Sequence, residues 1–129
     1  MKRTVLAVVL GLVAWVLVVS LLNRGLRVVL DGYVAAEQAF VFTLGMQIAR
    51  LAIGAVTSVV AGACVAAIAP ASRAAPWIVG GVLLAGFIPE HVWLWQKFPV
   101  WYHLTFLVTL VPLVVAGARL AAPRAPRVA

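Results

Sequence analysis

Four long, nearly uncharged apolar segments restrict what this chain can fold into. They cover residues 4–22, 48–69, 76–95 and 100–120. A helix rises about 1.5 Å per residue, so each segment has close to the ~20 residues that cross the hydrocarbon core of a bilayer. Backbone groups in lipid must be hydrogen-bonded within their own segment, which favours helices over strands. The sequence predicts an all-α fold, an integral-membrane four-helix transmembrane bundle that forms a single domain.

The few polar residues agree with this fold class and exclude others. Charged residues make up 10% of the chain, against about 25% in soluble domains. The formal net charge is +7, but the basic residues lie at the ends of apolar segments and not on one polar face, so no nucleic-acid partner is predicted. Cys64 has no second thiol to pair with and is interpreted as a small buried hydrophobe. No phosphate-binding loop or nucleotide motif is present, and no cofactor is expected.

The basic residues also predict the orientation, because cytoplasmic loops are enriched in Lys and Arg. With the N-terminus in the cytoplasm, the basic residues on that side are Lys2, Arg3, Arg73, Arg119, Arg124 and Arg127. Those on the outer side are the fewer Arg24, Arg27, Arg50 and Lys97. We therefore predict a multi-pass protein of the bacterial inner membrane with both termini cytoplasmic. Residues 121–129 would form a cytoplasmic tail, and the first segment is too long for a cleavable signal peptide.

The connection of residues 23–47, on the outer side, is the longest. Its Asp31-Gly32 pair predicts a turn. Residues 33–47 are helical in composition, and either extend the second span or lie in the interface as an amphipathic helix. Thr43, Gln47 and Arg50 share one helical face. That shared face favours the extension.

Small residues at four-residue spacing mark two of the predicted spans. They are Gly54, Ser58, Gly62 and Ala66 in the second span, and Gly81 and Ala85 in the third. Such stripes let neighbouring helix backbones approach closely. We predict that the second and third spans pack through these faces. The same faces are candidates for contact with another membrane protein or with a second copy of the chain.

A polar cluster is predicted near the outer ends of the spans, formed by Arg50, Glu90, His91 and His103. Ionisable residues at membrane depth are costly and tend to face partners or cavities. Arg50 and Glu90 lie near the outer ends of neighbouring spans, so we hypothesise that they form an ion pair. The alternative for Arg50 is snorkelling, with its charged group in the interface.

The two histidines and Glu90 are suitable metal ligands by type. No HxxxH or HExxH spacing supports a metal site, so we interpret both histidines as interfacial and predict no metal and no catalytic residue. The aromatic residues around them are interpreted as an interface belt. The belt consists of Trp93, Trp95, Phe98, Trp101 and Tyr102.

Trp93-Leu94-Trp95 before the last span and Gly117-Ala118-Arg119 at its end resemble elements of a group of small four-span bacterial membrane proteins of unknown function. The resemblance implies the four-span layout and carries no activity or cofactor. The sequence favours a non-enzymatic accessory or interaction protein that acts through its helix faces within the lipid bilayer. The alternative is a small transporter or proton-linked permease subunit that uses Arg50, Glu90 and His103.

Overall fold

The structure, a computed structural model, describes residues 1–124, and its secondary structure there is entirely helical. In chain order the helices are α1 (Lys2–Val29), α2 (Tyr33–Ala39), α3 (Leu44–Ile68), α4 (Ala75–Trp93) and α5 (Val100–Ala121). All of them except the short α2 are long and apolar enough to cross a membrane. The predicted fold class, an all-α bundle of four membrane-spanning helices, is confirmed.

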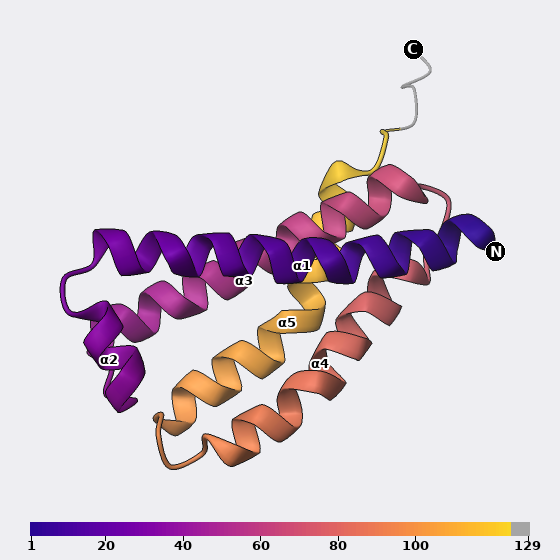
Figure 1. The fold of residues 1–129 in the computed structure, drawn as a ribbon. Helices are drawn as coiled ribbons and strands as arrows, with labels where there is room; N and C mark the ends of the chain where they lie inside the picture. Colours follow the sequence, from indigo (N-terminus) through magenta and orange to yellow (C-terminus); the bar gives the residue numbers. More distant parts are fainter. Residues whose placement is uncertain (125–129) are drawn as a thin grey trace.

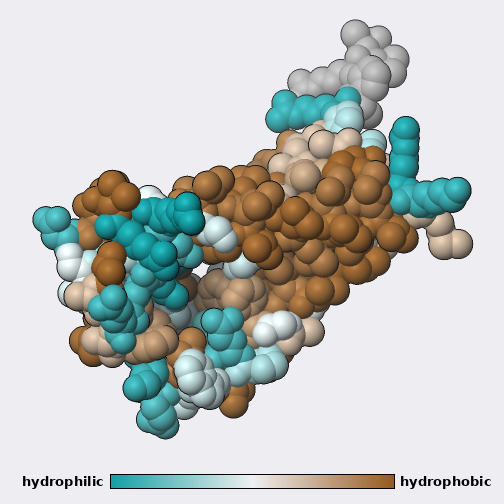
Figure 2. Space-filling view, in the orientation of Figure 1, coloured by the Kyte–Doolittle hydropathy of each residue, from teal (hydrophilic) through white to brown (hydrophobic). Residues whose placement is uncertain are grey.

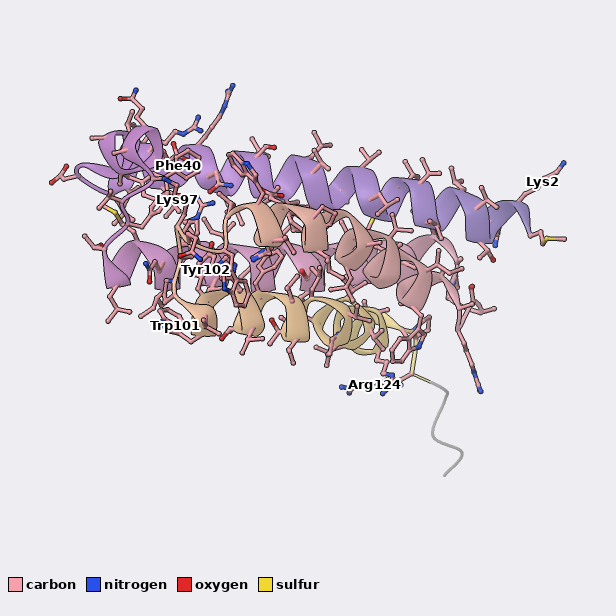
Figure 3. All side chains as sticks on the ribbon, turned by 90° about the horizontal axis from the view of Figure 1, so that it is seen from below. Lys2, Phe40, Lys97, Trp101, Tyr102 and Arg124 are labelled. Atoms are coloured by element: carbon pink, nitrogen blue, oxygen red, sulfur yellow. The ribbon has the colours of Figure 1, made fainter. Side chains whose placement is uncertain are left out.

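The long helices alternate in direction, so the bundle has two distinct ends (Figure 1). One end, called here the α2 end, carries the C-terminus of α1, all of α2, the start of α3 and the α4–α5 connection. On the face seen in Figure 2, hydrophobic residues cover the middle of the bundle and hydrophilic residues lie towards both ends. Phe40, Lys97 and Trp101 lie at the α2 end, whereas Lys2 and Arg124 lie at the opposite end (Figure 3).

The predicted extension of the second span through residues 33–47 is wrong for residues 33–43, because α3 begins at Leu44. Residues 33–39 form the separate helix α2, which ends at Phe40 in the left-handed backbone region with φ 53°. The Phe40 N–H donates to the carbonyls of Ala36 and Glu37, which closes the last turn of α2. Thr43 then caps a new helix, since its Oγ1 accepts the Met46 N–H at 3.3 Å. These local hydrogen bonds end one helix and start the next.

The first connection is also shorter than predicted, because α1 continues through residues 23–29 as helix. The predicted turn at Asp31-Gly32 is confirmed, with Gly32 at φ 78°. Further along, α4 runs through Pro89 to Trp93, as expected for a span that continues past the proline. At the C-terminus, α5 ends at Ala121, and residues 125–129 of the predicted tail, with Arg127, lie outside the described residues.

The small-residue stripe of α3 packs mainly against α5, and not against α4 as predicted. A Cβ atom added at Gly62 would run into the backbone carbonyl of Val114, and one added at Gly117 would run into that of Val59. The two helix backbones therefore touch in a way that only glycine permits. On α4 the predicted face points outward, because Gly81 and Ala85 are exposed.

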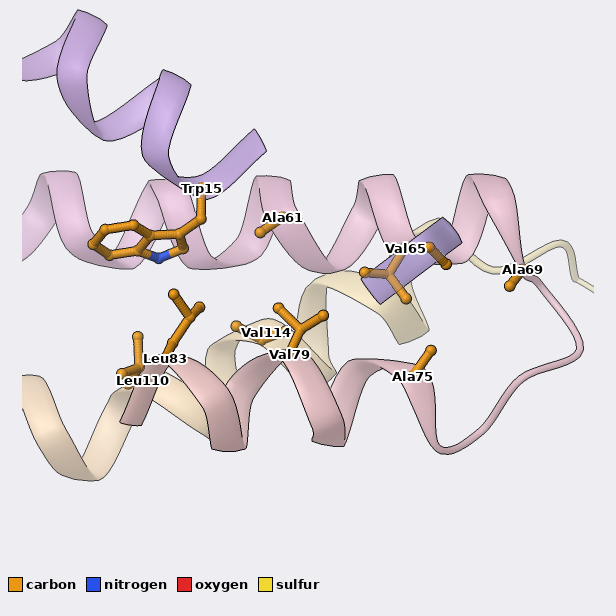
Figure 4. Packing of buried hydrophobic residues seen from close by; sticks show 10 residues of the cluster. Trp15, Ala61, Val65, Ala69, Ala75, Val79, Leu83, Leu110 and Val114 are labelled. Carbon is orange, nitrogen blue, oxygen red and sulfur yellow. The ribbon is translucent and has the colours of Figure 1, made fainter. Parts of the chain in front are cut away.

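The apolar core lies between the long helices, towards the end opposite α2 (Figure 4). The α4 side of this core is supplied by Ala75, Val79 and Leu83, so α4 is rotated away from the predicted face. Trp15 of α1 closes the core on the side of the α2 end. Its Nε1 donates to Ser58 Oγ at 3.2 Å, and this hydroxyl donates to the Gly54 carbonyl at 2.7 Å. Beyond Trp15, polar side chains enter the interior.

Candidate functional site

Arg50 on the second turn of α3 reaches into the interior at the α2 end. Its Nη1 donates to the Tyr33 hydroxyl at 2.8 Å, and its Nε donates to the Tyr102 hydroxyl at 3.2 Å. The side chain is 28% exposed. A guanidinium this far inside needs partners, and the two phenols of the chain, from α2 and α5, both supply one. Arg50 therefore links α3 to the preceding helix α2 and to the distant helix α5.

The carboxylate nearest to Arg50 is that of Glu37, and the hypothesised Arg50–Glu90 ion pair is not formed. Arg50 Nη1 lies 4.0 Å from Glu37 Oε1, while Arg27 Nε lies 2.7 Å from Glu37 Oε2. Glu90 is exposed and forms no ion pair with any residue in the described part of the chain. Because Glu37 is held more closely by Arg27, the charge of Arg50 is only partly neutralised.

Two phenylalanine rings lie beside the guanidinium of Arg50. Its Cζ lies 4.8 Å from the ring centroid of Phe42 and 5.9 Å from that of Phe98, and these two rings stack on each other. Phe98 and Tyr102 are buried, each with 6% exposure, so they do not belong to the predicted interface belt. The three tryptophans of that group, Trp93, Trp95 and Trp101, are exposed. Cation–π contact stabilises an arginine that is partly removed from water.

The predicted interfacial placement of the histidines is wrong. His91 is 6% exposed and His103 is fully buried. Their Nδ1 atoms lie 2.7 Å apart, at hydrogen-bonding distance. The short connection between α4 and α5, from Leu94 to Pro99, brings the two rings together. Burial is favoured because each imidazole supplies the polar partner that the other needs.

Burial indicates which histidine donates. His103 Nε2 is enclosed and has no hydrogen-bond partner in residues 1–124, and the Trp95 ring stacks on this imidazole at a centroid distance of 4.9 Å. An enclosed N–H without an acceptor is rarer in proteins than an enclosed lone pair without a donor. The proton of His103 therefore belongs on Nδ1, which donates to His91 Nδ1. His91 then carries its own proton on Nε2.

A cavity of about 210 Å³ lies between α1, α3, α4 and α5, next to Trp15. We call it the histidine cavity. Its polar lining consists of Asn23, Arg50, Glu90, His91 and Tyr102. Much of the rest is aromatic, from Trp15, Phe87, Phe98 and Phe106. Figure 2 shows the surface hollowed below α1 on the side of the α2 end. Three of the four residues predicted to cluster line this cavity. The fourth, His103, does not line it but lies at hydrogen-bonding distance from His91.

A second hollow of about 520 Å³, the α2 crevice, lies on the other side of Arg50. Arg27, Glu37 and Gln38 supply much of its polar lining, and Arg50 lines both hollows. Tyr33, the partner of Arg50 Nη1, is buried. Burial raises the pKa of the Tyr33 phenol above its ordinary value, although the hydrogen bond from Arg50 opposes the shift. Tyr33 thus stays a neutral hydroxyl that accepts from Arg50.

Other parts of the described chain offer weaker candidates. A hollow of about 420 Å³ at the opposite end is lined by Arg73 and Arg119. Both arginines are exposed, as expected for basic residues at the end of a membrane bundle. Within residues 1–124 no three His, Cys, Asp or Glu side chains converge in a way that would hold a metal ion. The histidine cavity is therefore the site with the most distinctive chemistry.

Sequence reasoning missed Tyr33, Glu37 and Tyr102 as the partners of Arg50. One signal was present, because Tyr33 and Glu37 are four residues apart and share one face of a helix. Tyr102 was assigned to the interface belt, and nothing in its spacing indicated that it faces inward. The link between Trp15 and Ser58 was missed for the same reason.

No family model, curated protein or solved structure matches this chain. The resemblance to small four-span bacterial membrane proteins stays an expectation.

Proposed function

We propose that this chain is a non-enzymatic accessory protein of the bacterial inner membrane that binds a small molecule in the histidine cavity. The observation that carries the proposal is the state of Arg50. A guanidinium has five N–H donors, and those of Arg50 that bond to protein in residues 1–124 come from Nε and Nη1. Nη2 forms no hydrogen bond with the described residues, and the side chain lines the cavity. A partly buried cation with unused donors is suited to an acceptor group of a ligand.

The lining of the cavity supports binding more than catalysis. Among the described residues, no serine, threonine, cysteine or lysine lines it. Aromatic and charged groups converge there instead, as in sites that bind small molecules. The volume, about 210 Å³, is below the roughly 300–1,000 Å³ of pockets for drug-sized ligands. The ligand is therefore small.

The small-residue helix faces support the proposed accessory role less than we expected from the sequence. The stripe on α3 is occupied by α5 of the same chain. Exposed aliphatic residues elsewhere, such as Val13 and Leu17 of α1, suit lipid tails as the surrounding partner. The accessory role that we propose still includes contact with another membrane protein or with a second copy of the chain. We assign no particular helix face to that contact.

Binding is tested with small anions on the purified full chain. Benzoate, N-acetylphenylalanine and inorganic phosphate are added to protein in maltoside detergent, and the melting temperature is recorded. We expect at least one anion to raise the melting temperature of the unaltered protein and of Arg24→Gln, an exposed-arginine control. The same anion should have no effect on Arg50→Gln. If no anion in the panel acts through Arg50, the proposed function is wrong. If Arg50→Gln does not fold, Arg50→Lys, which keeps the positive charge, replaces it in the same measurement.

Transport is a second candidate, favoured by the position of Arg50 between the α2 crevice and the histidine cavity. A ligand or proton that moves between the two hollows passes this side chain, with Glu90 and the histidine pair close by. Glu90→Gln should then abolish a pH-dependent flux in liposomes while the fold stays intact. If the unaltered protein shows no flux, the transport candidate is excluded.

The orientation belongs to the same proposal, with both termini cytoplasmic and the α2 end outside. Single cysteines at positions 73 and 97, in a Cys64→Ala background, test it with a membrane-impermeant thiol reagent added to intact cells. Position 97 should be labelled from outside and position 73 should be protected. The reverse pattern would place the α2 end in the cytoplasm.

A further inference from the structure

Arg50 and Glu90 line the same cavity with opposite charges and do not contact each other. Arg50 projects from α3 and Glu90 from α4, and both belong to the lining of the histidine cavity. The nearest carboxylate to Arg50 is that of Glu37, which Arg27 also binds. We propose that the cavity takes a zwitterion, a small molecule with an anionic group and a primary ammonium on a short spacer. This inference rests on the proposed function and names the ligand class of the same site.

The anionic group of the ligand lies at Arg50, where two side chains with donors free in the described chain line the cavity. One is the guanidinium, whose Nη2 has no protein acceptor in residues 1–124. The other is His91, because its Nδ1 accepts from His103 and its Nε2–H is the ring donor left for the cavity. Charge-assisted hydrogen bonds from these groups favour a carboxylate or a phosphate.

The ammonium lies at Glu90, towards the exposed edge of the cavity. A carboxylate there without a cationic partner accepts N–H bonds from an ammonium. Opposite charges that line one space attract each other. In this cavity they are held apart on separate helices, so the arrangement is complementary to a ligand that carries both charges.

On the side of the apolar core, the lining of the cavity is apolar. Trp15, Phe87 and Phe106 form this part of its wall, and the rings of Phe87 and Phe106 pack at a centroid distance of 5.0 Å. Such a wall suits a short aliphatic or aromatic group attached to the zwitterion. Two sources offer this chemistry in a membrane protein: a free apolar α-amino acid, and the head group of phosphatidylethanolamine with the first carbons of its chains.

The experiment compares ligands that keep or lose one charge. Leucine is the zwitterion, N-acetylleucine keeps only the anion, and leucinamide keeps only the cation. Dihexanoyl phosphatidylethanolamine and dihexanoyl phosphatidylglycerol form the matching lipid pair. Each is titrated by calorimetry into the full chain in maltoside detergent. We expect leucine, the phosphatidylethanolamine or both to bind at least about tenfold more tightly than their single-charge analogues, the size of one lost charge-assisted hydrogen bond.

The arm that binds identifies the source, a free amino acid or a lipid head group. Glu90→Gln should lower the affinity for the zwitterion at least about tenfold and leave the affinity for N-acetylleucine unchanged. Asp31→Asn removes an exposed carboxylate at the turn before α2 and should change neither affinity.

Failure of this inference is distinguishable from failure of the proposed function. If N-acetylleucine or phosphatidylglycerol binds as tightly as its zwitterion, and does so only when Arg50 is present, the site binds anions and the zwitterion inference is wrong. If leucinamide binds best, the polarity assigned to the site is wrong. If none of the five compounds binds, the zwitterion inference is overturned, and the anion panel decides the proposed function by itself.

Discussion

His91 and His103 meet through their Nδ1 atoms at 2.7 Å, across the connection between α4 and α5. They are the two histidines of the chain, and each is the hydrogen-bond partner of the other inside a bundle that has few polar groups. The pair places His91 on the wall of the histidine cavity and His103 behind it. A hydrogen bond between the Nδ1 atoms of two neutral imidazoles needs different tautomers, and this difference can be measured.

We predict that His103 is protonated on Nδ1 and His91 on Nε2 at neutral pH. The reason is that His103 Nε2 is enclosed without a partner, where a lone pair is tolerated better than an N–H. Nitrogen-15 spectra of histidine-labelled protein in detergent report the tautomer of each ring, and His103→Phe assigns the signals. Two rings that both carry the proton on Nε2 would contradict the hydrogen bond.

Gly62→Ala should destabilise the bundle strongly, because the new methyl group would collide with the Val114 carbonyl. The backbone of α5 has to move away from α3, and overpacking of this kind lowers the free energy of unfolding by at least about 1–3 kcal/mol. Gly81→Ala is the matched control on α4, since no atom lies within 4 Å of the added Cβ. Thermal unfolding in detergent measures both variants. Equal melting temperatures would show that α3 and α5 are not in backbone contact.

The hydrogen bond from Trp15 to Ser58 should make a measurable contribution to stability. Ser58→Ala leaves the buried indole N–H without its acceptor, and Trp15→Phe removes the donor. We expect a coupling free energy of about 0.6 kcal/mol from the double-mutant cycle, the average found for hydrogen bonds between membrane helices, with about 1.7 kcal/mol as the maximum. Ser20→Ala is the control, because this hydroxyl bonds within its own helix at an exposed position. A coupling near zero would argue against the contact.

Tyr33 should ionise at a higher pH than an ordinary tyrosine, because burial raises the pKa of its phenol. The Tyr102→Phe variant leaves Tyr33 as the remaining tyrosine, so the phenolate absorbance reports it directly. Since the folded pKa is the higher one, the stabilisation is complete below the ordinary tyrosine pKa of about 10 and is lost as pH rises through the folded value. The melting temperature should therefore fall in that alkaline window. A titration midpoint at the value of the denatured chain would contradict the burial of Tyr33.

The sequence by itself determined the helical class, the four spans and the first turn, because these depend on residues that are close together in the chain. A run of apolar residues long enough to cross a bilayer has to form a helix that satisfies its own backbone, whatever lies beside it. This is why the all-α class and the four spans follow from the sequence, and why the Asp31-Gly32 turn was predicted. The break before Leu44 was missed, because the Thr43 cap was read as part of one continuous helical face.

Only the tertiary structure decided which helix faces meet and which polar groups pair. In lipid, a neighbouring helix is hardly more apolar than the solvent, so the hydrophobic pattern does not indicate the inward face. Successive residues on a helix point about 100° apart, which is why Gly80 faces α5 while Gly81 is exposed. The same rotations bring Tyr33, Glu37 and Tyr102 to Arg50, leave Glu90 without an ion pair within residues 1–124, and join His91 to His103. These contacts link residues far apart in the chain, and their geometry is set by how the helices pack.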